Sequence, residues 1–188
     1  MLLLEQILNG LQYSALLFLL ASGLTLIFGI MGVINLAHGA FYMVGAFCAA
    51  YTAMATGSFW LGGLAALIGS ACYGALIETS IMRHLYKRDH LDQVLATLAV
   101  VFFSNELLTL IFGRSPPAMP TPEWYSSFVQ VLPGLMYPVS RLLFIAAGLL
   151  VAIGMWLLIN HTRLGMLIRA GADDHEMVGA LGVNIARL

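Results

Sequence analysis

Residues 6–77 read QILNGLQYSALLFLLASGLTLIFGIMGVINLAHGAFYMVGAFCAAYTAMATGSFWLGGLAALIGSACYGALI. This run of 72 residues lies between Glu5 and Glu78 and contains no Asp, Glu, Lys or Arg. A hydrocarbon core about 30 Å thick takes about 20 helical residues per crossing, so the run is long enough for three crossings and two tight turns. Turn sequences occur where this division needs them, GIMG at 29–32 and TGS at 56–58. The stretch therefore predicts three consecutive membrane-spanning helices.

The rest of the sequence has the same character. The chain has 188 residues, of which 61% are hydrophobic and 9% are charged, and its mean hydropathy is +0.93. A soluble domain carries roughly 25% charged residues, so this chain lacks the charge to cover a water-facing surface. A net charge of −1 excludes a basic nucleic-acid binder. Long unbroken apolar runs also differ from the short alternating strands of a membrane barrel, and they favour helices, which satisfy their own backbone hydrogen bonds in lipid.

We expect an all-α polytopic membrane protein with about five transmembrane helices. The spans are placed at residues 7–28, 33–55, 59–82, 94–112 and 142–159, with an outer loop at about 113–141. Residues 1–159 are the predicted transmembrane domain, and residues 160–188 are a C-terminal segment outside the membrane. Three basic residues follow the third span, three follow the fifth, and two flank the outer loop. Because basic residues collect in the cytoplasm, the C-terminal segment is expected there and the N-terminus outside.

The predicted outer loop is rich in proline and carries Trp124 and Tyr125. Tryptophan and tyrosine favour the membrane–water interface, and proline restricts the backbone. We expect this loop to be an ordered interfacial cap that can contain a short helix.

Small residues recur at every fourth position of the third predicted span. They are Ser58, Gly62, Ala66, Ser70 and Gly74. This spacing forms a groove on one helix face, in which another backbone can approach closely. The groove can pack against a helix of the same chain, which is the commoner arrangement, or form a contact between subunits.

Asn35 and His38 interrupt an otherwise apolar stretch, and Gly39 follows directly. On a helix, side chains three residues apart share a face. In one interpretation these residues line a polar path or break a helix at mid-depth in the membrane. In the other they lie in the first turn of the second span, at the cytoplasmic interface, where the amide caps the helix. The sequence leaves both interpretations open.

Glu106 lies well inside the fourth predicted span and follows Ser104 and Asn105. A charged group at the bilayer centre costs roughly 2.5–3.5 kcal/mol, so this carboxyl group should face protein or water, or be protonated. It is a candidate for the substrate path. The alternative is a carboxyl group that bonds to a neighbouring helix or lies near the outer interface.

The sequence carries no recognisable catalytic or metal-binding constellation. The four histidines other than His38 lie in predicted loops without spaced carboxylate or thiolate partners, and both cysteines lie in apolar stretches. No glycine-rich loop followed by Lys and Ser or Thr is present, so the chain is not expected to bind ATP through a P-loop. We expect no catalytic residue, no metal and no cofactor, and we expect any ATP hydrolysis to occur in a separate subunit.

The segment GLTLIFGIMGVINLAHGAFYMVGA at 23–46 closely resembles a stretch of the ABC-transporter permeases for branched-chain amino acids. Two weaker similarities follow in the expected order. Glu78 with the RHL sequence at 83–85 resembles the family's Glu and Arg-Pro-Leu, with His84 where proline is common. Residues 163–184 resemble its cytoplasmic coupling segment, in which Glu176 and Gly182 keep the usual six-residue offset and Val178 replaces an alanine.

The resemblance implies a permease subunit of an ATP-driven importer that moves branched-chain amino acids across the bacterial inner membrane by alternating access. It implies four kinds of partner: a second permease subunit, two cytoplasmic ATP-binding subunits, an external substrate-binding protein and the lipid bilayer, but no nucleic acid. The residues that the resemblance assigns to ATPase coupling are Arg169, Ala170, Glu176, Leu181 and Gly182. Family members continue with further spans after this segment, so the chain is expected to be a truncated permease.

Three other functions stay open at this point. Similar permeases carry urea or short-chain amides, and the motif does not separate these cargoes. The chain could instead be a non-transporting membrane subunit or a fragment that only assembles with partners. The third alternative is an integral-membrane enzyme that uses His38 and Glu106.

Overall fold

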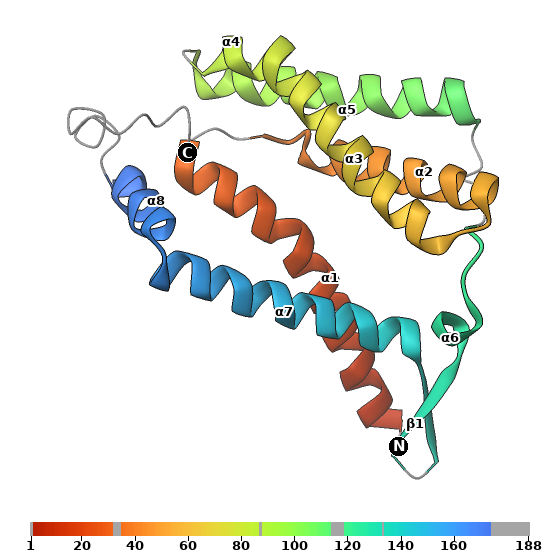
Figure 1. The fold of residues 1–188 in the computed structure, drawn as a ribbon. Coiled ribbons are helices and arrows are strands. Elements are labelled where there is room, and N and C mark those ends of the chain that lie inside the picture. Colours follow the sequence, from red (N-terminus) through yellow and green to blue (C-terminus); the bar gives the residue numbers. More distant parts are fainter. Residues whose placement is uncertain (1, 32–34, 87, 114–118, 133, 174–188) are drawn as a thin grey trace. The chain divides into compact units, whose positions relative to one another are not determined.

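The computed structural model describes residues 2–31, 35–86, 88–113, 119–132 and 134–173, and nearly all of them are helical (Figure 1). Five helices in this part of the chain are long and apolar enough to cross a membrane. They are α1 (Leu2–Met31), α2 (His38–Thr56), α3 (Phe59–Ile77) with its extension to Leu85, α5 (His90–Phe112) and α7 (Val139–His161). The prediction of a polytopic helical membrane protein with about five crossings is confirmed.

Helix boundaries follow from local sequence signals. Helix α2 ends at Gly57, which has φ of +67° and donates its N–H to the Ala53 carbonyl at 2.8 Å. Glycine adopts this left-handed conformation without a Cβ clash, so it ends the helix. One residue later, the Ser58 side chain accepts a hydrogen bond from the Leu61 N–H and caps α3.

The extension of α3 beyond Ile77 begins with a π-helical turn, η1 (Glu78–Met82), followed by the short helix α4 (Arg83–Leu85). Ile77 and Met82 are five residues apart and both are buried in one apolar cluster with Ala37 and Val100. In a regular α-helix, positions five apart point about 140° away from each other. The wider π turn therefore brings Met82 to the face that Ile77 occupies.

Contacts divide the chain into two compact units. The terminal unit combines Met1–Gly32 with Glu123–Leu188, and the central unit is Val33–Pro122. The central unit contains α2, α3, η1, α4 and α5. The terminal unit contains α1, α7, α8 (Arg163–Asp173), the short helix α6 (Glu123–Ser126), and strands β1 (Phe128–Leu132) and β2 (Leu135–Pro138).

In the central unit, α2 packs closely along the small-residue groove of α3. A Cβ added to Gly62 would lie 2.8 Å from the Ala49 carbonyl oxygen and 3.0 Å from the Ala53 Cβ. From the other side, a Cβ on Gly45 would lie 3.3 Å from the Ala66 carbonyl oxygen. The groove is therefore used within the chain, which is the first of the two interpretations considered for it.

In the terminal unit, α1 and α7 cross where Gly148 allows close approach. A Cβ on Gly148 would lie 2.8 Å from the Ala15 Cβ. Near the start of both helices, the Asn9 Oδ1 accepts hydrogen bonds from Tyr137 at 3.2 Å and from Arg141 at 2.5 Å. This polar contact joins the N-terminal part of α1 to the end of β2 and the start of α7.

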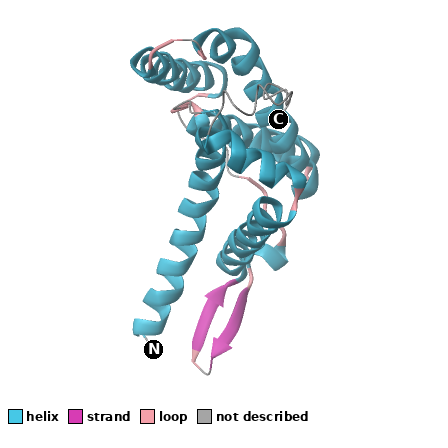
Figure 2. Ribbon diagram, turned by 90° about the vertical axis from the view of Figure 1, so that its left-hand side faces the viewer, coloured by secondary structure: helices cyan, strands magenta, loops and turns pink. Residues whose placement is uncertain are grey.

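Strands β1 and β2 form an antiparallel hairpin that Figure 2 shows extending beyond the first turn of α7. Val129 pairs with Tyr137, and the register shifts between Gln130 and Leu132. The short helix expected in this loop is α6, whereas the hairpin is an addition to the all-α expectation. The Pro-Gly sequence at 133–134, whose glycine has φ of +88°, is a sequence signal for the turn between the strands.

Candidate translocation and coupling site

The segment before α2 is a turn held by the Asn35 side chain. The Asn35 Oδ1 accepts a hydrogen bond from the Ala37 N–H at 3.0 Å, and both residues are buried. Helix α2 therefore begins at His38, whereas the sequence placed the start of the span at residue 33. The side-chain amide takes up one of the backbone donors that the first turn of a helix leaves unpaired.

This helix start is recessed between its neighbours. The Phe41 ring packs edge-to-face on Tyr73 at 6.1 Å, and the Tyr73 hydroxyl contacts the Ser104 Oγ at 2.5 Å, so these three residues lie at a similar level. From that level α2 continues only to His38, whereas α5 continues to His90 and the extended α3 continues to Leu85. At 1.5 Å per residue, α2 begins about 13–16 Å short of both neighbours.

Figure 1 shows the same relation within the central unit, where α3 and α5 continue past the first turn of α2. The Asn35 hydrogen bond forms a turn directly before α2, while Ala37 at the helix N-cap has no side-chain cap hydrogen bond. The choice between a polar path within the membrane and a helix start at the cytoplasmic interface stays a prediction.

His38 and Gly39 are the first two residues of α2, and their surroundings differ. The His38 ring packs edge-to-face on Phe41 at 6.2 Å, and its Nδ1 is buried without a hydrogen-bond partner among the described residues. Gly39 is exposed, and a Cβ there would meet no described atom within 4 Å. The imidazole therefore has a buried nitrogen without a hydrogen-bond partner, while Gly39 has no close neighbour in the described part of the chain.

Helix α5 presents a buried polar stripe that was not among the predicted site residues. Gln93, Thr97 and Ser104 are all at most 3% exposed, and with Val100 they recur at spacings of four, three and four residues. The Thr97 hydroxyl donates to the Gln93 carbonyl at 2.8 Å, and the Ser104 hydroxyl donates to the Val100 carbonyl at 2.5 Å. This helical spacing of polar residues within an apolar span was the available signal.

Glu106 lies on α5, six residues before the helix ends at Phe112, and its side chain is exposed. It forms no hydrogen bond or ion pair with another described residue, and the alternative of a carboxyl group bonded to a neighbouring helix finds no support there. The Tyr51 hydroxyl contacts the Phe112 carbonyl at 3.3 Å, which places the end of α5 beside the C-terminal part of α2. His38 begins α2 at the other end, so the structure does not bring Glu106 and His38 together.

Glu78, in the π-helical turn, accepts a hydrogen bond from the Tyr86 hydroxyl. Burial of Tyr86, together with the hydrogen bond to Glu78 and the negative charge of that carboxylate, raises the pKa of the Tyr86 hydroxyl above its usual value. The hydrogen bond from Tyr86 to Glu78 connects the end of the extended α3 to its own π turn.

The start of the C-terminal segment is a helix, α8, attached to the end of α7 by specific contacts. The Arg169 Nη1 donates to the Ile159 carbonyl at 2.6 Å and lies 3.4 Å from the Asn160 Oδ1. The Thr162 Oγ1 accepts from the Gly165 N–H at 3.1 Å, and a Cβ on Gly165 would overlap the carbonyls of α7. A guanidinium at a helix C-terminus also interacts favourably with the helix dipole. These contacts define the α7–α8 elbow, formed by Ile159, Thr162, Gly165 and Arg169.

The predicted coupling residues fall into two groups. Arg169 is in the elbow, and Ala170 is half-buried on the same helix. Glu176, Leu181 and Gly182 lie outside the described residues. Within the residues that the structure describes, no three His, Cys, Asp or Glu side chains are grouped so that they could hold a metal ion.

The chain is similar to known proteins over nearly its whole length. Residues 6–188 match the family model described as branched-chain amino acid transport system / permease component. The chain is 28% identical over 192 residues to the high-affinity branched-chain amino acid transport system permease protein BraD of Pseudomonas aeruginosa. It is 27% identical over 204 residues to the permease protein LivH of Salmonella typhimurium, and 28% over 196 residues to a probable LivH of Methanocaldococcus jannaschii.

These alignments cover 96%, 98% and 97% of this chain, but 62%, 64% and 59% of the three relatives. The chain thus spans about three fifths of the length of these curated relatives. No solved structure matches the chain significantly.

Proposed function

The chain belongs to the family of permease components of branched-chain amino acid transport systems, and on that premise we propose that it is a permease subunit of an ATP-driven importer of branched-chain amino acids. The observation that carries the proposal is the family match over residues 6–188, which includes most of the first candidate membrane-spanning helix and the whole of the other four. The relatives BraD and LivH are named as permease proteins for these amino acids. The protein itself is a multi-pass membrane protein.

The proposed partners follow from the transporter class. A second permease subunit completes the pathway, two ATP-binding subunits hydrolyse ATP on the cytoplasmic side, and an external binding protein delivers the amino acid. The N-terminus lies outside and the C-terminal segment inside, in the inner membrane of a bacterium. The uneven distribution of basic residues between the two ends of the spans supports this orientation.

In the proposed mechanism, Asn35, His38 and Gly39 contribute to the substrate path from the recessed start of α2. An amino-acid carboxylate needs a polar partner in the membrane, and unpaired N–H groups at a helix start provide one. The buried Nδ1 of His38, which has no partner among the described residues, supports this assignment. Glu106 contributes nearer the other end of α5, where its exposed carboxylate faces the second permease subunit or the aqueous path.

Coupling to ATP hydrolysis is assigned to residues 169–182. When the ATP-binding subunits close, they displace this segment, and α8 transmits the displacement to α7 through the α7–α8 elbow. The hydrogen bonds of Arg169 to the end of α7 support this route, because they resist separation of the two helices. Alternating access then results from rearrangement of the helices around the path.

Uptake by proteoliposomes tests the proposal. The chain is reconstituted with its partner ATP-binding subunits, second permease and binding protein, and radiolabelled leucine, urea and acetamide are supplied in parallel. We expect leucine to accumulate only with both ATP and binding protein. Accumulation of urea or acetamide without leucine would reassign the cargo, and failure of all three in an intact assembly would indicate a non-transporting subunit.

Two substitutions locate the path and the coupling contact. His38→Ala should lower leucine uptake at unchanged protein level, because it removes the only buried unpaired imidazole atom among the described residues. If the His38→Ala variant showed normal uptake, His38 would not belong to the substrate path.

Gly182→Trp should abolish co-purification with the ATP-binding subunits. The control is Gly154→Trp, which should not, because a Cβ added at Gly154 meets no described atom within 4 Å.

A further inference from the structure

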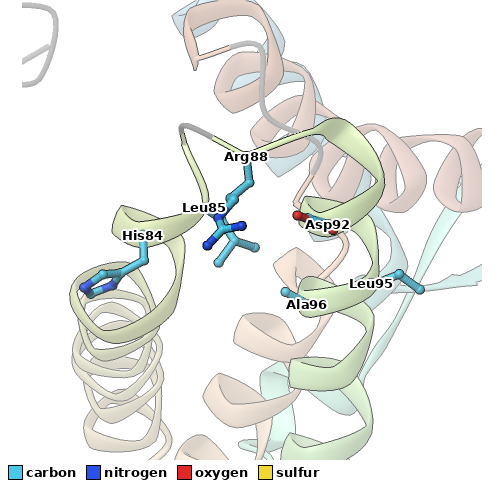
Figure 3. A pocket seen from close by; sticks show the side chains of 6 residues that line it. All are labelled: His84, Leu85, Arg88, Asp92, Leu95 and Ala96. Carbon is cyan, nitrogen blue, oxygen red and sulfur yellow. The ribbon is translucent and has the colours of Figure 1, made fainter.

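An open cavity of about 480 Å³ lies between α4 and the start of α5 in the central unit. It is lined by His84, Leu85, Arg88, Asp92, Leu95 and Ala96. Figure 3 shows Arg88 and Leu85 extending into the space between the helices from one side, while Asp92 and Ala96 face it from the other. His84 and Leu95 point outward at its rims.

Hydrogen bonds from the buried Gln93 side chain hold the carbonyls on both sides of the turn that carries Arg88. The Gln93 side chain is 3% exposed, and its Nε2 donates to the Leu85 carbonyl at 3.3 Å and to the Arg88 carbonyl at 3.1 Å. The Arg88 N–H also donates to the Leu85 carbonyl at 2.9 Å. These bonds fix the backbone of the turn without using the guanidinium, which remains available to a ligand.

The cavity presents two opposite charges that do not pair with each other. Neither the Arg88 guanidinium nor the Asp92 carboxylate has a hydrogen bond or ion pair with another described residue. A ligand that pairs with both side chains carries an anionic group and a cationic group. Leu85 and Ala96 face the cavity and Leu95 lies at its rim, so a hydrocarbon part of the same ligand would contact apolar side chains.

The location of the cavity identifies the source of such a ligand. It lies at the turn between two membrane-spanning segments, Phe59–Leu85 and His90–Phe112, and therefore at a membrane–water boundary whichever way the chain is oriented. Leu95 and Ala96 are five and six residues into α5, about 8–9 Å below its start, at the depth where acyl chains begin. Phospholipids fill this boundary at high local concentration, and basic pockets between membrane helices bind their headgroups.

We propose that this cavity binds the headgroup of a zwitterionic phospholipid that carries a primary amine, with the phosphate on Arg88, the ammonium on Asp92 and an acyl chain along Leu95. A guanidinium forms strong charge-assisted hydrogen bonds with phosphate oxygens. The Asp92 carboxylate accepts N–H bonds from a primary ammonium, whereas a quaternary choline has no N–H to donate. The same carboxylate repels a headgroup with net negative charge.

The test compares lipids that differ only in the headgroup. The full chain, purified in detergent, is mixed with phosphatidylethanolamine, phosphatidylcholine or phosphatidylglycerol of identical acyl chains, and bound lipid is counted by native mass spectrometry. We expect about two- to fivefold higher occupancy by phosphatidylethanolamine than by either other lipid, as one charged hydrogen-bonded contact near a surface provides. Equal retention of all three lipids, or preference for phosphatidylglycerol, would overturn the proposal.

Matched variants test whether Asp92 binds the amine and Arg88 binds the phosphate. Asp92→Asn should remove the preference over phosphatidylcholine, whereas Asp89→Asn, which alters an exposed neighbour outside the cavity, should keep it. Arg88→Gln should lower retention of all three lipids, whereas Arg83→Gln should not. If Asp92→Asn leaves the preference intact in a monodisperse sample, the amine does not bind there. The experiment needs no uptake, so its result is independent of the proposed transport function.

Discussion

At the scale of single residues, the Asn35 amide supports a helix start that lies between longer neighbouring helices. A backbone donor that is buried without a hydrogen-bond partner is costly. The Asn35 Oδ1 accepts the Ala37 N–H, and both residues are buried beside the apolar cluster of the central unit. The polar side chain thus compensates for the missing preceding turn of helix.

Replacing Asn35 by alanine tests this role. Asn35→Ala leaves the buried Ala37 N–H without its acceptor, which typically costs about 1–3 kcal/mol. For a chain of this size the apparent midpoint of thermal unfolding in detergent should fall by roughly 2–12 °C. Asn105→Ala, at an exposed position of α5, is the control and should change the midpoint little. An unchanged midpoint for Asn35→Ala would show that the hydrogen bond contributes nothing to stability.

The sequence indicated that Asn35 and His38 interrupt an apolar run, and a helix start was one of the two interpretations that it left open. It could not place their depth, because that depends on how far α3 and α5 continue past the contact of Phe41 with Tyr73. Glu106 illustrates the reverse case. Its position within the fourth span was evident, but which way its carboxylate faces depends on packing between helices.

At the scale of elements, the pairing of α2 with α3 depends on the absence of side chains at a few positions. A Cβ at Gly62 meets the Ala49 carbonyl oxygen at 2.8 Å, closer than real Cβ contacts allow, and that atom belongs to backbone. At Gly63, the next residue, an added Cβ would have no described atom within 4 Å. Adjacent glycines in one helix therefore have opposite tolerance to substitution.

Gly62→Ala should separate α2 from α3 and destabilise the chain by about 1–3 kcal/mol, the usual range for overpacking. Gly63→Ala should be neutral or stabilising, because alanine has a higher helix propensity than glycine. Thermal unfolding of both variants in the same detergent measures the difference. Equal midpoints would mean that the two helices do not approach as closely as described.

The α7–α8 elbow gives a second prediction at this scale. Arg169→Ala removes the hydrogen bond to the Ile159 carbonyl, so amide hydrogen exchange in α8 should accelerate by about tenfold, as expected for loss of one charged hydrogen bond. In the proposed transporter, ATP hydrolysis should continue while uptake falls. Arg163→Ala, an exposed position on the same helix, is the control. If amide hydrogen exchange in α8 were unchanged in this variant, the elbow would not be a rigid connection between α7 and α8.

Among the elements, the long helices were predictable because each fills a charge-poor apolar run of membrane-spanning length. The π-helical turn was not, since it follows from the need to bury Ile77 and Met82 on one face of the extended α3. The β1–β2 hairpin lies in a proline-rich loop, and its inner face is fixed by contacts of Tyr137 with Asn9, which is 128 residues away in the sequence. Non-local contacts of this kind leave no local pattern.

At the scale of the whole molecule, the proposed orientation depends on six basic residues at one side of the spans against two at the other. Cysteine labelling tests it directly. With Cys48 and Cys72 replaced by alanine, a membrane-impermeant maleimide should label His175→Cys from the cytoplasmic side and Ser126→Cys from the outside. The opposite pattern would invert the topology and with it the assignment of residues 169–182 to ATPase coupling.

The filled groove of α3 has a consequence for assembly. Because α2 of the same chain already occupies the groove at Gly62 and Ala66, any further helix that packs on this part of α3 meets its other faces, which carry large exposed side chains such as Leu64, Leu67 and Ile68. A seam of that kind relies on interlocking bulky side chains, so it should accept exchanges among leucine, isoleucine and methionine yet weaken when a side chain is truncated to alanine.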